Sequence, residues 1–341
     1  MRAFSRAFLC FCFLVSIRSV QAADASKPLQ IYFVDVEGGQ STLVVSPSGE
    51  SLLIDTGWPG YEGRDADRIM TASHQAGLKQ IDYVLITHYH RDHVGGVPQL
   101  VDGMKVGTFV DHGPNLEQSQ AAKADYAAYE KAIAGHPHVV VKPGWGLPIK
   151  GIQVQVLSAA GEHITQSLPG AGEANTYCAG ETPNADATEN ARSLGILITY
   201  GQFRFLDLGD LTKKKELELA CPNNLLGKVD VFLVTHHGGD LSNPKALVWA
   251  LHPRVAIFNN GPRKGASPAA WQIVHDAPGL QDVWQLHYAE ESDKDHNIDP
   301  ERIANIKENC EGKYLKVTAD KDGRFTVFNG RTAAEKKYSK R

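Results

Sequence analysis

The chain lacks several features that would place it in a specialised class of protein. It has 5 cysteines in 341 residues, which excludes a disulfide-rich miniprotein. It has no excess of basic residues, because 35 basic and 39 acidic residues give a formal charge of −4, and this gives no support for tight nucleic-acid binding. With 42% hydrophobic and 22% charged residues, it is neither disordered nor collagen-like. A phosphate-bearing substrate is still allowed, because a bound metal supplies positive charge that composition does not count.

The N-terminal segment has the pattern of a secretory signal peptide. Residues 1–22 contain no acidic residue, and Arg2 and Arg6 precede a short apolar run that ends in small residues near Ala22. This predicts export to the periplasm or the medium, because a membrane anchor would need a longer run. Cleavage removes three of the 35 basic and none of the 39 acidic residues, which leaves a charge of −7. No later run is apolar enough to cross a bilayer, so residues 23–341 are expected to form a single domain without a membrane span.

The cysteines that remain after cleavage suggest one disulfide bond. Cys10 and Cys12 leave with the signal peptide, and Cys178, Cys221 and Cys310 stay. In an oxidising compartment one pair is expected, and Cys178 with Cys221 is the preferred pair because both lie in polar loops that contain proline. The alternative is three separate thiols.

Short β-like runs recur along the chain and few helices are evident. Strands are expected over residues 29–36, 42–46, 51–55, 81–87, 108–111, 152–157, 194–200, 203–207, 229–235, 255–259, 283–287, 315–319 and 325–328. Helices are expected over residues 65–76, 119–134 and 212–220. Residues 159–190 form a long loop, which in a compact domain is usually functional or a lid. Residues 85–88 and 233–236 are similar, which hints at two related halves.

The hexapeptide His88-Tyr89-His90-Arg91-Asp92-His93 carries most of the chemical information. It follows the expected buried strand 81–87 and precedes Gly95-Gly96, which permit a tight turn behind it. At the end of a strand His88 and His90 point the same way and can share one metal ion. A following helix would aim Asp92 and His93 at a neighbouring point, which suits two ions. The alternative is a solvated polar loop.

Two further segments fit the same site. Asp210 follows a strand and Gly209, and its carboxylate could bridge two cations. His236 and His237 follow another strand. The similarity between residues 85–88 and 233–236 favours His236 as the metal ligand, with His237 behind it or facing the substrate.

These motifs resemble the metallo-β-lactamase superfamily. The resemblance covers roughly residues 30–290 and is greatest to the branch that includes the hydrolase domain of bacterial competence (DNA-uptake) proteins and the phosphorylcholine esterases. The matching segments are the hexapeptide, Leu53-Ile54-Asp55-Thr56-Gly57, Asp35-Val36-Glu37-Gly38-Gly39-Gln40-Ser41, Asn190-Ala191-Arg192-Ser193-Leu194, Gly209-Asp210 and His236-His237-Gly238.

The resemblance implies an α/β fold, a four-layer αββα sandwich with a dinuclear site at one edge. It implies two divalent ions, with Zn²⁺ as the first choice and Mn²⁺ or Fe²⁺ as alternatives. The implied metal ligands are His88, His90, Asp92, His93, Asp210 and His236, and Asp55 would orient them from behind.

The chain also departs from the pattern of the branch. Glu37 stands where the branch often has glycine, and Gln40 where it often has aspartate. A further histidine of the β-lactamases is missing from residues 188–191, which leaves one metal with fewer protein ligands.

The predicted activity is hydrolysis by a hydroxide that bridges the two metals, with Asp92 and Asp210 as the catalytic carboxylates. His112, Asn190, Ser193, His237 and Asn260 are the remaining candidates for substrate or supporting contacts. A phosphodiester or similar anionic ester on a small molecule or a head group is the favoured substrate; nucleic acid is less favoured, because the chain is acidic. The alternatives are a β-lactam or lactone hydrolase, and a non-catalytic binding module in which the metal only stabilises the fold.

Overall fold

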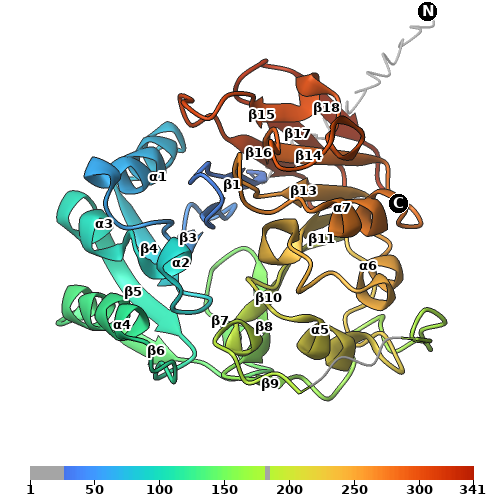
Figure 1. Cartoon of the computed structure of the whole chain (residues 1–341), viewed down its shortest axis with the longest axis horizontal. Helices are drawn as coiled ribbons and strands as arrows, with labels where there is room; N and C mark the ends of the chain where they lie inside the picture. Colours follow the sequence, from blue (N-terminus) through green and yellow to red (C-terminus); the bar gives the residue numbers. More distant parts are fainter. Residues whose placement is uncertain (1–26, 181–184) are drawn as a thin grey trace, which may run out of the picture.

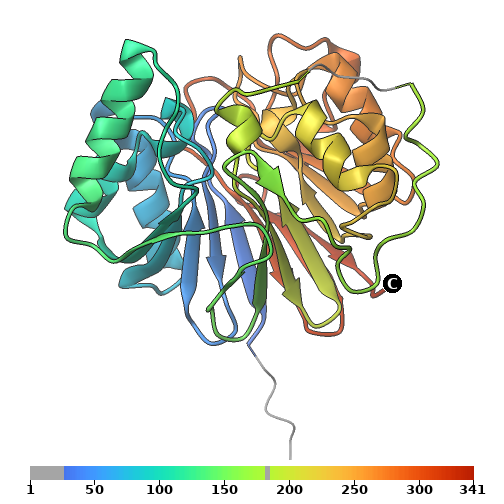
Figure 2. The same cartoon turned by 90° about the horizontal axis from the view of Figure 1, so that it is seen from below.

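A computed structural model describes residues 27–180 and 185–341 of the chain. The predicted signal peptide, residues 1–22, lies outside these ranges. Within them, the strands form two large mixed sheets that face each other, with helices on the outer side of each (Figures 1 and 2).

The first sheet joins the N-terminal and C-terminal parts of the chain. Its order is β18-β17-β16-β1-β2-β3-β4-β5-β6. The strands are β1 (Leu29–Phe33), β2 (Thr42–Val45), β3 (Ser51–Ile54), β4 (Gln80–Leu85), β5 (Lys105–Asp111), β6 (His138–Val140), β16 (Leu315–Ala319), β17 (Phe325–Asn329) and β18 (Glu335–Tyr338). From β3 to β6 the strands are parallel, and the others pair antiparallel.

The second sheet is built from the middle of the chain. Its order is β15-β14-β13-β12-β11-β10-β8-β7, with β9 paired to β8. The strands are β7 (Gly146–Leu147), β8 (Gln153–Ala159), β9 (Glu162–His163), β10 (Gly195–Tyr200), β11 (Phe203–Asp207), β12 (Val231–Leu233), β13 (Val255–Phe258), β14 (Asp282–His287) and β15 (Ile303–Asn305). From β11 to β15 the strands are parallel.

The helices cover the two outer faces. On the first sheet lie α1 (Arg64–Gln75), α2 (Arg91–Val94), α3 (Val97–Gly103) and α4 (Gln120–Ile133), and on the second α5 (Lys213–Ala220), α6 (Lys245–Leu251) and α7 (Pro268–His275) (Figure 2). Short 3-10 turns are η1 (Tyr61–Gly63), η2 (Asn190–Arg192), η3 (Thr235–Gly238), η4 (Lys294–His296) and η5 (Pro300–Arg302).

Three apolar cores separate the four layers. One fills the space between the sheets, with Phe33 of β1 against Phe205 of β11 at 5.7 Å between ring centroids. A second lies between the first sheet and its helices, and a third between the second sheet and its helices. Where helices cover the sheets, the strands are buried on both faces, and β12 is accordingly apolar throughout, whereas β4 keeps Gln80 and Asp82 at partly exposed positions. The predicted αββα sandwich is confirmed.

Other sequence predictions on the scaffold can also be compared with the structure. Residues 159–180 and 185–190 contain little regular structure beyond β9. The predicted Cys178–Cys221 disulfide is confirmed, with 5.9 Å between the Cα atoms, and Cys310 is a free thiol. None of the helices within the described ranges has the length and apolar character needed to cross a bilayer.

Candidate metal centre

The hexapeptide lies just beyond the carboxyl end of β4, where the chain turns into α2. His88 and His93 are fully buried, Asp92 is buried, and His90 is partly exposed. The turn fits closely against its neighbours: a Cβ atom at Gly96 would collide with the carbonyl oxygen of Thr56. The predicted use of glycine for close packing behind the hexapeptide is therefore confirmed.

Three distant segments converge at this point. Asp210 follows β11, and His237 lies in η3 after β12. Asp210 Oδ2 is 3.3 Å from His93 Nε2 and 3.4 Å from His237 Nε2, and Asp92 Oδ2 is 3.4 and 3.3 Å from the same two nitrogens. One ligand atom from each of these four residues lies within 4.8 Å of the other three. We call these four residues the carboxylate–histidine cluster.

The remaining predicted ligands flank this cluster. His88 stacks beside His93 at 4.1 Å between ring centroids, and its Nε2 is 3.0 Å from His90 Nδ1. His236 Nε2 is 3.3 Å from Asp210 Oδ2. Asp210 Oδ2 therefore lies within 3.4 Å of three imidazole nitrogens, those of His93, His236 and His237.

The placement of the paired histidines differs from the expectation. The sequence favoured His236 as the ligand, with His237 behind it or facing the substrate; in the structure His237 is the more buried of the two and contacts both carboxylates. Both residues have positive φ, 56° and 54°, so the alternation of side chains along a strand does not apply to them. The structure directs both imidazoles at Asp210.

Asp55 lies behind His93, as expected from the resemblance. Its fully buried carboxylate accepts hydrogen bonds from the Thr87 backbone NH at 2.7 Å and from the Thr87 hydroxyl at 2.6 Å. Asp55 Oδ2 is also 2.7 Å from His93 Nδ1. A proton held on Nδ1 by Asp55 leaves the lone pair of Nε2 facing the cluster.

The other predicted residues fall into two groups. Near the cluster, Ser193 Oγ accepts a hydrogen bond of 3.2 Å from the Asp210 backbone NH, and Asn190 Nδ2 is 3.4 Å from His236 Nε2. Farther back, His112 is buried with its Nε2 2.9 Å from Glu189 Oε1. Asn260 is also buried, and its amide donates to the carbonyl oxygens of Gly261 and His287. Asn260 therefore holds its own loop in place.

Several residues beside the site were not singled out by their pattern. Gln40 donates from Nε2 to both carboxylate oxygens of the buried Asp207, at 3.1 and 3.0 Å. Glu189 lies near the Tyr89 backbone NH as well as near His112. The only signal for Gln40 was that it departs from the motif of the branch, and single buried carboxylates such as Asp207 have no sequence signature.

Burial and neighbouring positive charges have opposite effects on the pKa values of the carboxylates in the cluster. Burial disfavours the charged carboxylates, but His93 and Lys264 outweigh it and hold the pKa of Asp92 well below its usual range. His237 and His93 do the same for the pKa of Asp210. Burial also lowers the pKa of His88 well below its usual range. The site therefore combines ionised carboxylates with a neutral imidazole, which is the donor set that a divalent ion needs.

Buried polar atoms without a hydrogen-bond partner indicate whether the residues of the cluster fit a metal ion. Among the described residues, His93 Nε2, His237 Nε2 and Asp210 Oδ1 are buried and have no hydrogen-bond partner. Buried polar groups are normally satisfied, so unpaired nitrogens and an oxygen in one place call for a ligand that accepts lone pairs. A divalent cation is such a ligand, and these residues fit it.

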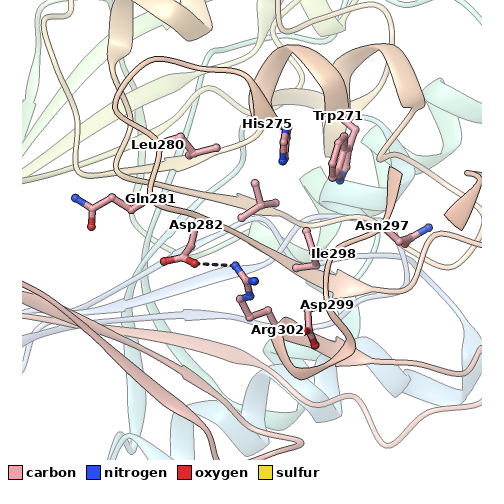
Figure 3. A pocket seen from close by; sticks show the side chains of 10 residues that line it. Trp271, His275, Leu280, Gln281, Asp282, Asn297, Ile298, Asp299 and Arg302 are labelled. Atoms are coloured by element: carbon pink, nitrogen blue, oxygen red, sulfur yellow. Dashed lines mark hydrogen bonds and ion pairs between the residues drawn. The ribbon is translucent and has the colours of Figure 1, made fainter. Parts of the chain in front are cut away.

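A pocket that is separate from the cluster lies where β14 begins, at the opposite end of this strand from His287 (Figure 3). It is lined by Trp271 and His275 of α7 and by Asp282, whose Oδ1 is 2.7 Å from Arg302 Nη1. Asp282 begins β14 and His287 ends it, a separation of roughly 16 Å. This pocket contains no residue of the carboxylate–histidine cluster.

Comparison with known proteins supports the resemblance seen in the motifs. Residues 34–180, which include the hexapeptide, match the family model of the metallo-β-lactamase superfamily. The resemblance to the metallo-β-lactamase superfamily is therefore confirmed over this segment. The match and the cluster together support a metal-dependent hydrolase.

Curated relatives extend the similarity beyond the matched segment. The chain is 27% identical over 247 residues to ComE operon protein 3 of Bacillus subtilis, covering 68% of this chain and 28% of that protein. It is 26% identical over 239 residues to recombination protein 2 of Haemophilus influenzae, covering 69% and 25%. It is 28% identical over 127 residues to a hydroxyacylglutathione hydrolase of Xylella fastidiosa, covering 36% and 38%. The chain thus spans about a quarter of the length of the first two relatives, and the expected likeness to competence proteins is confirmed.

Proposed function

We propose that this protein is an exported metal-dependent hydrolase, that it carries two divalent ions, and that it cleaves a phosphodiester or a similar anionic ester on a small molecule or a head group. The observation that carries the substrate class is the position of Lys264. Its ammonium group contacts Asp92 Oδ2 at the edge of the carboxylate–histidine cluster. A cation at this edge suits a substrate whose anionic oxygen lies next to the bond that is cleaved.

The surroundings of Lys264 hold its ammonium group at the cluster. The ammonium lies 5.1 Å from the ring centroid of Trp58, and a Cβ atom at Gly38 would approach Lys264 Cβ to 3.0 Å. The side chain is about one-third exposed. When a bound cation neutralises Asp92, the ammonium of Lys264 is free to pair with a phosphate oxygen. A substrate would approach the cluster from the side on which Lys264 is exposed.

The residues of the site have separate roles in the proposed reaction. Asp55 fixes the tautomer of His93, so that Nε2 binds metal. Asp210 would hold the metal together with the three imidazoles that its Oδ2 approaches, those of His93, His236 and His237. Bound cations lower the pKa of water and stabilise charge that develops on the attacked oxygen. Asp92 would accept a hydrogen bond from the attacking water and pass its proton on to solvent or to the leaving group, because a carboxylate with so low a pKa does not retain a proton.

The donor set supports the choice of metal. Imidazole nitrogens and carboxylate oxygens, with no thiolate in this cluster, suit Zn²⁺, with Mn²⁺ and Fe²⁺ as alternatives. Metal analysis of the purified protein tests this choice. Two equivalents of Zn²⁺ per chain are expected in the cluster and its flanking histidines, in addition to the single ion proposed below for a separate site.

A hydrolase of acyl esters is the second candidate. It is favoured by the similarity to a hydroxyacylglutathione hydrolase. The two candidates make different demands on Lys264, because an acyl ester does not need a cation beside the cleaved bond.

Kinetics of Lys264→Gln tests the proposed substrate class. With bis-p-nitrophenyl phosphate and p-nitrophenyl phosphorylcholine as substrates, we expect KM to rise about tenfold or more and metal content to stay at the wild-type level. The matched control is Arg263→Gln, because Arg263 pairs with Glu290 and Glu308 away from the cluster. Turnover of nitrocefin or a thioester without turnover of either phosphodiester would replace the proposal with the acyl candidate.

Export is proposed on two observations. The first 22 residues have the pattern of a signal peptide, and the Cys178–Cys221 disulfide suits an oxidising compartment. Expression of the full chain in a Gram-negative host, followed by fractionation, tests this. We expect the protein in the periplasm or the medium with a new N-terminus near residue 23; an intact N-terminus in the cytoplasm would contradict export.

A further inference from the structure

We propose that the chain holds a second and separate metal site, formed by Asp35, Glu37, His287 and Cys310, which binds one borderline divalent ion such as Zn²⁺. We call it the thiol cluster. It uses none of the residues of the carboxylate–histidine cluster and takes no part in the proposed hydrolysis, so it goes beyond the proposed function.

The candidate ligand atoms of the thiol cluster lie close enough together to surround one ion. Cys310 Sγ is 3.2 Å from Asp35 Oδ2, 3.5 Å from Glu37 Oε1 and 3.9 Å from His287 Nε2. His287 Nε2 is 2.8 Å from Asp35 Oδ1, and one atom from each of the four residues lies within 4.8 Å of the others. Bonds of about 2.0–2.3 Å to a tetrahedral zinc place neighbouring ligand atoms roughly 3.3–3.8 Å apart. Only small shifts of side chains are needed.

The thiol cluster and Arg68 together carry a net charge of −2 when Cys310 is a thiolate. With Cys310 as thiolate, Asp35, Glu37 and Cys310 carry three negative charges. Arg68 supplies one positive charge, with its guanidinium 2.9 Å from Asp35 Oδ2 and 3.1 Å from Glu37 Oε1. A divalent ion brings the sum to zero, and this is what a buried site requires. The nearby Arg64 adds no net charge because Asp65 pairs with it at 2.6 Å.

Binding of the ion requires two protons to change place. The thiol proton of Cys310 leaves to solvent, which it can reach because Cys310 is only partly buried. His287 must present an unprotonated Nε2, so its ring proton moves to Nδ1. His287 Nδ1 is buried and has no hydrogen-bond partner within the described part of the chain. No oxidant or reductant is needed.

The backbone at Glu37 is consistent with a specific use of its carboxylate. Glu37 has φ of 56°, a left-handed conformation that costs little for glycine and more for other residues. Its side chain contacts Cys310 and Arg68. A carboxylate is therefore present at a position where the backbone alone favours glycine.

The thiol cluster ties together parts that support the hydrolytic centre. Asp35 and Glu37 begin the loop whose next residues meet the centre: the Gln40 backbone NH donates to the Asp92 carbonyl oxygen at 3.0 Å. The His287 carbonyl oxygen accepts a hydrogen bond of 2.9 Å from Asn260, which precedes the loop of Lys264. An ion in the thiol cluster would fix these two loops and the segment around Cys310 relative to one another.

Cobalt binding tests the proposal independently of catalysis. The full chain is produced with Cys10→Ser and Cys12→Ser, so that Cys310 is the one thiol in the sequence outside the disulfide. On titration with Co²⁺ we expect a thiolate-to-cobalt charge-transfer band in the near ultraviolet, which ligands from histidine and carboxylate do not give. The band should be lost in Cys310→Ser. In Glu37→Gln the Kd that it reports should rise about tenfold or more.

The matched control is Glu311→Gln, because Glu311 is an exposed neighbour paired with Lys313 and should leave the band unchanged. Absence of the band at saturating Co²⁺, or its persistence in Cys310→Ser, would overturn the site and leave an ion-pair network around Arg68. A band in a protein without phosphodiesterase activity would support the site and contradict only the proposed function.

Discussion

At the scale of single residues, the function of His93 depends on a partner that never touches the metal position. Both nitrogens of its imidazole are buried, and Asp55 contacts Nδ1 while Nε2 faces Asp92 and Asp210. Burial disfavours the imidazolium, but Asp210, Asp92 and Asp55 outweigh it and raise the pKa of His93 well above its usual range. In the absence of a cation the site therefore favours a proton on each nitrogen, and metal must displace the one on Nε2.

Asp55→Asn is predicted to weaken metal binding without removing a ligand. The amide can still contact His93, but it does not fix the proton on Nδ1, so Nε2 presents its lone pair less often. We expect metal affinity to fall about 10–100-fold, measured by competition with a chromogenic chelator. The matched control is Asp67→Asn, on the exposed side of α1, where wild-type affinity is expected. Equal affinities of Asp55→Asn and wild type would show that Asp55 does not orient His93.

A second buried carboxyl group predicts a dependence of stability on pH. Burial raises the pKa of Asp207 to about 7, although Gly209 and Gln40 donate hydrogen bonds to it. Because the folded pKa lies above the unfolded value of about 4, the contribution of Asp207 is complete at pH below 4 and is lost as pH rises through 7.

Asp207→Asn is therefore predicted to gain stability relative to wild type as pH rises. The difference should be near zero at acidic pH and grow to a few kcal/mol, on the order of 4, above pH 7. Urea unfolding of the metal-free proteins at a series of pH values measures it. A difference that stays constant with pH would mean that Asp207 ionises normally.

At the scale of elements, the strands set the direction of the ligands and the turns set their spacing. The hexapeptide bends sharply after β4, and Gly96 lies close to the carbonyl oxygen of Thr56 without a positive φ. The backbone conformation would accept any residue, so glycine is required here only because there is no space for a Cβ atom.

Gly96→Ala is predicted to lower both stability and metal affinity. The methyl group must push the Thr56 segment away, which costs about 1–3 kcal/mol and moves Asp55 and His93 apart. Urea unfolding and metal titration measure the two effects. Gly146→Ala is the control, because the nearest atom to its Cβ position is Val154 O at 3.7 Å and its φ is not positive. Identical behaviour of the two variants would mean that the turn is not tightly packed.

The elements also show what the sequence could predict. The bounds expected for β11 and β16 agree with the structure, because their apolar runs are bounded by clear turns. Helices α6 and α7 were missed: each is 7 or 8 residues long and largely apolar, and such runs do not differ from buried strands by periodicity. The site was accessible through the spacing of its motif, whereas the choice between His236 and His237 depended on two positive φ angles that no pattern signals.

At the scale of the whole molecule, the net charge predicts which substrates the proposed centre favours. Without residues 1–22 the chain carries a net charge of −7. The positive charge of the proposed centre is confined to Lys264 and the bound metal ions. A short substrate feels mainly Lys264 and the metals. A long polyanion extends over the acidic surface and is repelled there, over distances set by salt.

This difference predicts opposite effects of salt on substrates of different length. For a single-stranded oligonucleotide, raising salt from about 50 to 200 mM screens the repulsion, so kcat/KM should stay level or rise; proteins that bind nucleic acid through basic surfaces lose affinity steeply over this range. For bis-p-nitrophenyl phosphate, which pairs only with Lys264 and the centre, kcat/KM should fall modestly. A steep fall for the oligonucleotide alone would reveal a basic path on the surface and make nucleic acid the preferred substrate.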